Sequence, residues 1–216
     1  MEERIARTME ALRSNRMEAY YVRTKEEAAG QVSALLREGD VIAAGGSVTL
    51  QETGIKDMLR RGPYRFLDRD REGLTRSEVE DIYRAAFGAD AYLCSANAIT
   101  ERGELYNVDG NSNRVAAILY GPKSVIVVAG CNKIVPDLAA AVRRVKAKAA
   151  PENCTRLSCE TFCRKTGECV SLRQESSEMP EGCRSEARIC CNYVVSAYQR
   201  QQGRIKVVLV GEPLGY

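Results

Sequence analysis

Cysteines form the densest chemical feature of this chain. Of its nine cysteines, only Cys94 and Cys131 lie outside residues 154–191. The clustered residues are Cys154, Cys159, Cys163, Cys169, Cys183, Cys190 and Cys191. Thiols concentrated in this way are typical of a zinc site, an iron–sulfur cluster or disulfides. The segment has no Cys-x-x-Cys pair, so it is neither a zinc-ribbon knuckle nor a ferredoxin-type run. Widely spaced cysteines still form a four-thiolate site where a loop folds back.

Histidine is absent from the sequence. This absence excludes a Ser-His-Asp triad, a Cys-His pair and a HExxH zinc site. Any metal must therefore be held by Cys, Asp, Glu or backbone groups. Any general base must be a carboxylate, a lysine, a tyrosine or a thiolate.

The composition is that of an ordinary globular protein. With 216 residues, 44% hydrophobic and 28% charged, we expect one domain over 1–216 that includes a cysteine-rich insertion at 151–191. The net charge of +3 gives no argument for nucleic-acid binding. No apolar run predicts a membrane span, and residues 1–17 lack the pattern of a signal peptide. We therefore expect a cytoplasmic protein, in which disulfides are disfavoured and metal binding is favoured.

The apolar pattern predicts strands that alternate with helices. Strands are expected at 40–44, 64–67, 91–95, 124–129 and 205–210, with a hairpin at 100–109. Helices are expected at 2–16, 24–39, 49–60, 75–87, 114–120 and 136–150. Capping-box pairs mark three helix starts, namely Thr24 with Glu27, Thr49 with Glu52, and Thr75 with Glu78. This order predicts an α/β fold with a mostly parallel sheet flanked by helices. The pattern breaks after Pro151, so the cysteines lie on an insertion before the last strand.

A glycine-rich turn follows the first predicted strand. It reads Gly45-Gly46-Ser47-Val48-Thr49. At the carboxyl end of a parallel strand, such a turn and its two hydroxyl side chains are typical of a phosphate or carboxylate pocket. The alternative is a tight strand-to-helix turn with Thr49 as the N-cap.

A polar segment, 97–114, follows another strand end. Glu101, Glu104 and Asp109 are candidate acids or bases, and Asn111 and Arg114 are candidate ligands for an anion. The alternative is a solvated hairpin whose Asp109-Gly110-Asn111 sequence forms the turn. Lys133 is a further polar residue at a strand end, and it is either an anion ligand or part of a helix entry.

Three blocks together resemble one known family. They are GGSVTLQETG at 45–54, the segment 97–133 with ITERGELYNVDGNSNRVAAILYGPKSVIVVAGCNK, and CRKTGEC at 163–169 with Arg188-Ile189-Cys190. This pattern resembles the stand-alone bacterial branch of the LUD (lactate-utilisation) domain family over nearly the whole chain. The resemblance implies the fold of ribose-5-phosphate isomerase and CoA transferases, in which the glycine turn and the Asp109 turn face one cleft.

The resemblance also implies a ligand set for the cysteine segment. The family pattern has Pro-Cys before Lys-Thr-Gly, where this chain has Phe162-Cys163. The matching thiols are Cys163, Cys169, Cys183 and Cys190. An insert at 171–182 displaces Cys183, for which Cys159 and Cys191 are alternatives.

Three functions follow from these observations. The first is a role in the oxidation of lactate or a similar small organic acid, with an iron–sulfur cluster or zinc and an iron–sulfur redox partner protein. The second is an enzyme for a phosphorylated metabolite or CoA ester that uses a carboxylate and has structural cysteines. The third is a thiol redox sensor. The fold analogy favours a homodimer.

Overall fold

The computed structural model describes residues 2–174 and 177–216. Its main sheet has six strands that all pair in parallel. Their order is β1 (Glu18–Val22), β10 (Ile205–Val210), β7 (Ser124–Gly130), β4 (Ala91–Cys94), β2 (Val41–Ala44) and β3 (Arg65–Leu67). The predicted α/β fold with a parallel sheet is confirmed.

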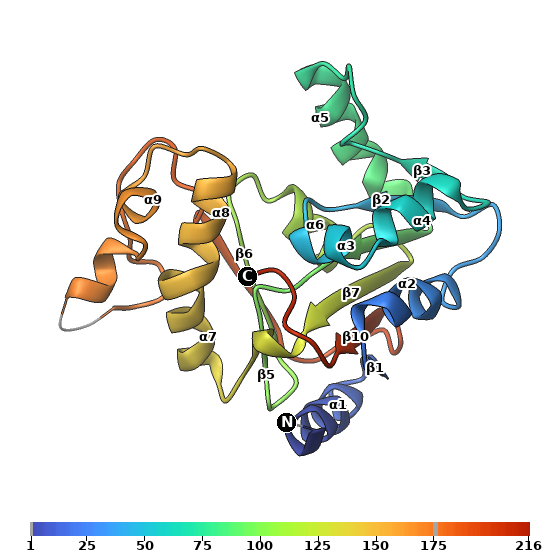
Figure 1. Cartoon of the computed structure of the whole chain (residues 1–216), viewed down its shortest axis with the longest axis horizontal. Coiled ribbons are helices and arrows are strands. Elements are labelled where there is room, and N and C mark those ends of the chain that lie inside the picture. The colour runs from blue at the N-terminus through green and yellow to red at the C-terminus, as the bar shows by residue number, and fades with distance from the viewer. Residues whose placement is uncertain (1, 175–176) are drawn as a thin grey trace.

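Helices cover both faces of this sheet (Figure 1). One face packs against α2 (Lys25–Ser33), α3 (Val48–Glu52) and α4 (Ile55–Arg61). The other face packs against α1 (Glu2–Ser14), the turn η1 (Ala86–Gly88) after α5 (Arg76–Ala85), and α6 (Asn113–Leu119). Successive residues of β7 enter opposite cores, as Val127 and Val128 do. A strand buried on both faces therefore reads as a continuous apolar run.

A smaller sheet lies beyond the carboxyl ends of the central strands. Its order is β8 (Ile134–Val135), β5 (Ala98–Thr100), β6 (Leu105–Asp109) and β9 (Asn192–Ser196). A continuous helical stretch packs on it, made of α7 (Leu138–Arg144), the π-helical turn η3 (Val145–Ala149) and α8 (Ala150–Arg156). The cysteine segment continues from α8 through α9 (Phe162–Thr166) and the turn η4 (Val170–Arg173) to β9.

Several predicted boundaries are corrected. Helix 49–60 is interrupted at Gly54, whose φ is +66°, and its cap is Ser47 rather than Thr49, because Ser47 Oγ accepts from Leu50 N at 3.3 Å. The helix predicted to end at 150 extends to Arg156. A π-helical turn ends at Ala149, two residues before Pro151, which has no N–H for a regular α ladder. Strands β1, β8 and β9 were not predicted.

The capping boxes at Thr24 and Thr75 and the hairpin at 100–109 are confirmed. Among the described residues, no helix has both the length and the apolar character needed to cross a bilayer.

Candidate functional site

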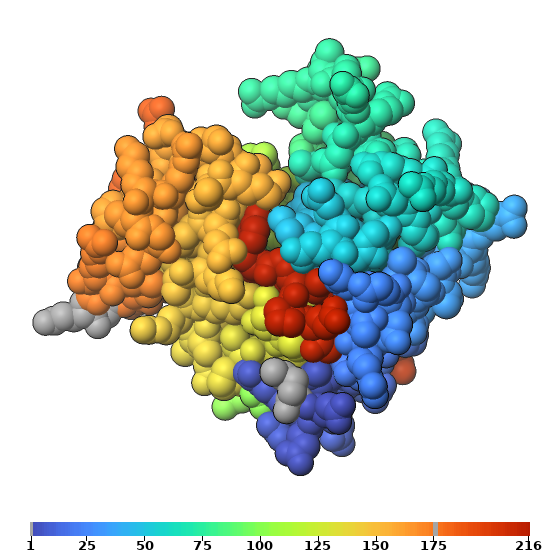
Figure 2. Space-filling view, viewed as in Figure 1, coloured from blue at the N-terminus to red at the C-terminus, as the bar shows by residue number. Residues whose placement is uncertain are grey.

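A cleft of about 480 Å³ lies between the two sheets, at the carboxyl ends of the central parallel strands. Gly46 and Ser47 contribute from the turn after β2, and Asp109, Gly110 and Asn111 contribute from the turn after β6. The two turns therefore face one cleft, as the resemblance implied. In the space-filling view, a groove separates α3 from α8 and the C-terminal segment lies in it (Figure 2).

The glycine turn is shaped by its neighbours. A Cβ atom at Gly45 would lie 3.0 Å from Tyr92 Oη and 3.4 Å from Arg114 Cδ, so a larger residue would push on both. Gly46 lies beside the Arg69 guanidinium, which would be 3.6 Å from an added Cβ. Ser47 uses its hydroxyl to cap α3. Thr49 is buried inside α3 and does not line the cleft.

Arg114 forms hydrogen bonds with several residues of the cleft wall. One terminal nitrogen, Nη1, donates to Asn107 Oδ1 at 2.6 Å and to Ser95 O at 3.2 Å. The other, Nη2, donates to Val108 O at 2.7 Å and to Asn97 Oδ1 at 3.0 Å. The third nitrogen, Nε, lies 3.7 Å from Asp109 Oδ2. Acceptors of the protein itself therefore surround the whole guanidinium group. Arg114 thus positions the wall, and its role as an anion ligand stays a prediction.

Asp109 organises the start of α6. Its Oδ1 accepts from Ser112 N and its Oδ2 from Val115 N, each at 3.2 Å. These contacts hold Ser112 in the left-handed conformation, with φ of 64°. Asn111 lines the cleft beside them.

The two predicted glutamates lie elsewhere. Glu101 forms ion pairs with Arg4 and Arg7 of α1, whose hydrogen bonds and charges lower the pKa of this carboxyl despite an opposing desolvation. Glu104 accepts a hydrogen bond from the hydroxyl of Thr100 in the same hairpin. Neither residue lines the cleft, so the structure brings only Asp109 of the three candidate carboxylates to it.

Lys133 lies at the floor of the cleft with only 3% of its surface exposed. Its Nζ donates to Ser95 Oγ at 2.9 Å and to Thr49 Oγ1 at 3.0 Å. Burial, together with repulsion from Arg144 and Arg114, lowers the pKa of this amine to about 7.

The cleft also contains cations that sequence reasoning missed. Arg69 follows β3, Arg156 ends α8, and Arg188 precedes β9. Asp109 and Glu186 are the acidic residues among the cleft-lining side chains. Arg156 Nε donates to Tyr216 Oη at 2.7 Å, which anchors the C-terminal segment against α8. The excess of cations favours an anionic ligand. Of these three arginines, only Arg69 could have been predicted as a cleft residue from the sequence, because it follows just after a short predicted strand.

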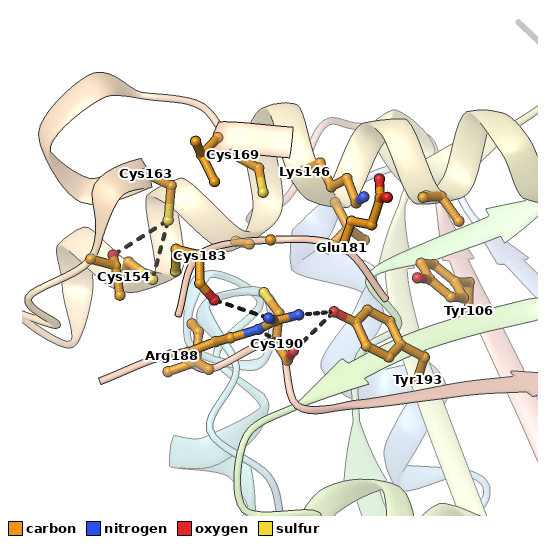
Figure 3. A pocket seen from close by; sticks show the side chains of 17 residues that line it. Tyr106, Lys146, Cys154, Cys163, Cys169, Glu181, Cys183, Arg188, Cys190 and Tyr193 are labelled. Atoms are coloured by element: carbon orange, nitrogen blue, oxygen red, sulfur yellow. Dashed lines mark hydrogen bonds between the residues drawn. The ribbon is translucent and has the colours of Figure 1, made fainter. Parts of the chain in front are cut away.

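A second, smaller cavity of about 30 Å³ is lined by five cysteines (Figure 3). These are Cys154, Cys163, Cys169, Cys183 and Cys190. The set includes all four thiols implied by the resemblance. Cys159 lies outside both cavities, and Cys191 lines the larger cleft. The structure therefore places Cys183, rather than its two alternatives, beside Cys163, Cys169 and Cys190.

Polar contacts fix the shape of this cavity. Arg188 donates to Cys190 O at 2.8 Å, to Cys183 O at 2.9 Å and to Pro180 O at 2.7 Å, so it folds the insert back on itself. Lys146, from the π-helical turn, donates to Ser177 Oγ at 2.9 Å and to Glu178 O. Burial lowers the pKa of Lys146. These two basic residues place positive charge beside the thiols.

The thiols differ in acidity. Cys154 Sγ and Cys163 Sγ lie 3.6 Å apart and share a hydrogen bond. This bond, with the Thr161 hydroxyl and the N–H groups of Cys163 and Arg164, lowers the pKa of Cys163 to about 6. Burial and the neighbouring thiols raise the pKa of Cys190 to about 12.

The donor set fits a thiolate-bound metal in chemistry, although it is not preassembled. Among the described residues, no three Cys, Asp or Glu side chains are close enough together to hold an ion as they stand. The 3.6 Å between Cys154 Sγ and Cys163 Sγ involves only one of the four implied ligands, because Cys154 is not in that set. It is too long for a disulfide, and all nine cysteines are free. Binding would require the other sulfur atoms to close in.

The two cavities share a wall. Val145, Ala150, Arg188, Ile189 and Cys190 line both of them. Cys190 therefore lies between the thiol cavity and the cationic cleft. A group held by the thiols would lie next to a ligand bound in the cleft.

Comparison with known proteins agrees with this architecture. The family model of the LUD domain matches residues 5–210. The solved structure of a DUF162 family protein from Deinococcus radiodurans is similar over 97% of this chain and 98% of that chain, with 14% identity and a TM-score of 0.52. No curated protein matches the sequence.

Two more distant structures are similar over part of the chain. A D-ribose-5-phosphate isomerase in complex with phospho-erythronic acid covers 63% of this chain and 67% of its own, with 13% identity and a TM-score of 0.40. The eIF2B beta structure from Chaetomium thermophilum covers 52% of this chain and 43% of its own, with 20% identity and a TM-score of 0.35.

Proposed function

The chain belongs to the LUD domain family, and on this basis we propose that it binds lactate or a similar small organic acid in the cationic cleft. We propose further that Cys163, Cys169, Cys183 and Cys190 hold a zinc ion or an iron–sulfur cluster beside that cleft. Membership of the family supports a function related to lactate utilisation. The protein would assist the oxidation of the acid in the cytoplasm, where thiols stay reduced.

The shared wall is the observation that carries this proposal. Cys190 and Arg188 line both cavities, so the thiol site and the anion site are neighbours rather than separate modules. An iron–sulfur cluster would supply electron transfer at this wall, whereas zinc would fix the fold of the insert. A redox partner protein would then be needed only for a cluster.

The residues of this chain have separate tasks in the proposal. Arg69 and Arg156 provide positive charge for a carboxylate, while Arg114 and Asp109 hold the wall in shape. The C-terminal segment covers part of the cleft, because Gly215 N donates to Glu52 Oε2 at 2.7 Å and Tyr216 contacts Arg156. The segment thus restricts the cleft to small ligands.

Calorimetric titration with lactate, pyruvate and phosphate tests the anion site. We expect Arg69→Met and Arg156→Met to weaken binding of the preferred acid about tenfold each, which is the effect of losing one charge-assisted hydrogen bond. Arg61→Met is the matched control, because Arg61 is exposed and lies outside the cleft. Equal affinities in all three variants and the parent would contradict the assignment of the cleft.

A further inference from the structure

Lys133 lies at the carboxyl ends of the strands of the main sheet, beside its inner strands. It belongs to the turn η2 (Cys131–Lys133), directly after β7. Its two hydrogen-bond partners come from the ends of neighbouring strands, since Ser95 follows β4 and Thr49 lies on the helix after β2. Three adjacent parallel strands thus converge on one amine nitrogen. In open α/β sheets, this edge is where ligands bind.

The hydrogen bonds around Nζ suit a neutral amine. A neutral amine has two N–H groups and one lone pair, whereas an ammonium group has three N–H groups. Within the described residues, Nζ has two acceptors, Ser95 Oγ and Thr49 Oγ1, and no carboxylate lies within ion-pair distance. Both hydroxyls have backbone acceptors of their own, Ala96 O and Leu214 O. Their oxygen lone pairs are therefore available to Lys133.

The charges that face Lys133 also disfavour its ammonium form. Arg144, from α7, donates to Asn97 O at 2.7 Å and to Asn132 O at 3.2 Å, and Arg114 comes from α6. Burial has the largest effect on the pKa of Lys133, and the two arginines lower it further. Glu52 on α3 and Cys94 at the end of β4 act in the opposite direction. A desolvated lysine beside other cations is an activated nucleophile.

We propose that Lys133 is a nucleophile that forms an imine with the carbonyl carbon of a short 2-oxo acid in the cleft. This inference rests on the proposed binding of a small organic acid. The 2-oxo acid is the oxidised form of that acid. The Nζ lone pair attacks the carbonyl carbon, the C=O π bond breaks, and the oxygen takes up the proton that Nζ releases to give a carbinolamine. Loss of one water molecule then forms the C=N bond. The step needs no oxidant or reductant, and water reverses it.

The walls of the cleft explain why a 2-oxo acid is the fitting class. Arg69 and Arg156 provide charge for its carboxylate, while Lys133 lies deeper, at the strand ends. Gly215 lies over the lysine, and a Cβ atom there would be 3.5 Å from Nζ and 2.7 Å from Thr49 Oγ1. Even a methyl group at this position would clash with Thr49, so the backbone packs closely beside the amine. This close packing suits a small carbonyl compound rather than a bulky ester.

Reductive trapping tests the proposal on the full-length protein. The protein is incubated with pyruvate and sodium cyanoborohydride at pH 7, and the adduct is located by peptide mass spectrometry. We expect one carboxyethyl group per chain, on Lys133. Lys133→Met should abolish the adduct, whereas Lys123→Met, which changes an exposed lysine, should leave it unchanged. The rate of trapping should rise through pH 7 and then level off.

The outcomes separate this inference from the proposed function. A folded parent protein without an adduct, or with adducts spread over surface lysines, would overturn the role of Lys133. If calorimetry then still shows that pyruvate binds, the organic-acid site stands without the imine. If calorimetry shows no binding of pyruvate or lactate, the proposed function fails as well. The thermal melting curve of Lys133→Met confirms that this variant is folded.

Discussion

Arg114 donates a hydrogen bond of 2.6 Å from Nη1 to Asn107 Oδ1, which joins the first turn of α6 to the centre of β6. Three further acceptors, Ser95 O, Asn97 Oδ1 and Val108 O, surround the same guanidinium group. The side chain is only 15% exposed. Arg114 therefore connects the main sheet to the smaller sheet across the floor of the cleft.

Removal of this guanidinium should destabilise the fold. Arg114→Met leaves Asp109 without its cationic partner and removes the donor from several buried acceptors, so we expect the free energy of unfolding to fall by about 3 kcal/mol. Urea denaturation followed by circular dichroism measures this change. Arg84→Met is the control, because Arg84 is 72% exposed and pairs only with Asp81; its effect should stay within about 0.5 kcal/mol. Equal stabilities of the two variants would show that the Arg114 network is not structural.

The cysteine variants should fall into two groups. Serine at Cys163, Cys169, Cys183 or Cys190 should remove most of the bound metal, because in the proposed site each of them supplies a thiolate. Cys159→Ser and Cys191→Ser should keep the metal, since neither side chain lines the thiol cavity. Metal content per chain, measured after anaerobic desalting, separates the groups.

Cys154 provides a sharper test of the ligand set. It lines the same cavity and lies 3.6 Å from Cys163, yet it is not among the four thiols of the family pattern. We expect Cys154→Ser to keep the metal, because Cys154 is outside the proposed ligand set and serine keeps a hydrogen-bonding group beside Cys163. Loss of metal in Cys154→Ser, with full retention in Cys183→Ser, would exchange these two residues in the ligand set.

The glutamate variants test the alternative carboxylate enzyme. Glu101 pairs with Arg4 and Arg7, and Glu104 contacts Thr100, both away from the cleft. We therefore expect Glu101→Gln and Glu104→Gln to bind organic acids within twofold of the parent affinity, as titration calorimetry would show. A larger loss in either variant would place the ligand in the hairpin rather than in the cleft.

The low pKa of Lys133 predicts a pH-dependent stability. The pKa of Lys133 is about 7 in the folded protein and that of an ordinary lysine is 10.5, so the unfolded chain binds the extra proton between these limits. The stability of the parent relative to Lys133→Met should therefore rise with pH through this window, by up to about 1.4 kcal/mol per pH unit. Thermal melts of both proteins at pH 7, 8 and 9, in reducing buffer, measure the difference. A constant difference would show that Lys133 titrates normally.

Local signals in the sequence predicted much of the fold. The capping boxes at Thr24 and Thr75 depend on residues three apart, and residues 125–129 of the buried strand β7 are all apolar, so both can be read without tertiary information. Strand β1 was missed because it is an edge strand that pairs only with β10, far away in sequence. Strand β9 was missed because it directly follows the cysteines and pairs with β6 across the whole insert.

The candidate site was also predicted only in part, because local signals place its turns but not its buried side chains. The turns at Gly46 and Asp109 could both be placed at strand ends, and the family resemblance implied that they face one cleft. Asp109 ends β6 of the smaller, largely antiparallel sheet, so strand alternation alone could not show this. Burial could not be read from the sequence in this way. Lys133 and Arg114 are polar residues in a polar-looking segment, and only packing against three strands removes them from water. Arg156 was not predicted as a cleft residue, because the helix was expected to end at residue 150 and instead continues past Pro151.

Quantification of zinc, iron and acid-labile sulfide in anaerobically purified protein tests the central claim most directly. We expect about one zinc ion, or the iron and sulfide of one cluster, for each chain. The double variant Cys163→Ser with Cys190→Ser should lose this content, whereas the double variant Cys159→Ser with Cys191→Ser should retain it. A folded, colourless parent protein that contains no metal, and in which all nine cysteines react with a thiol reagent after unfolding, would contradict the account.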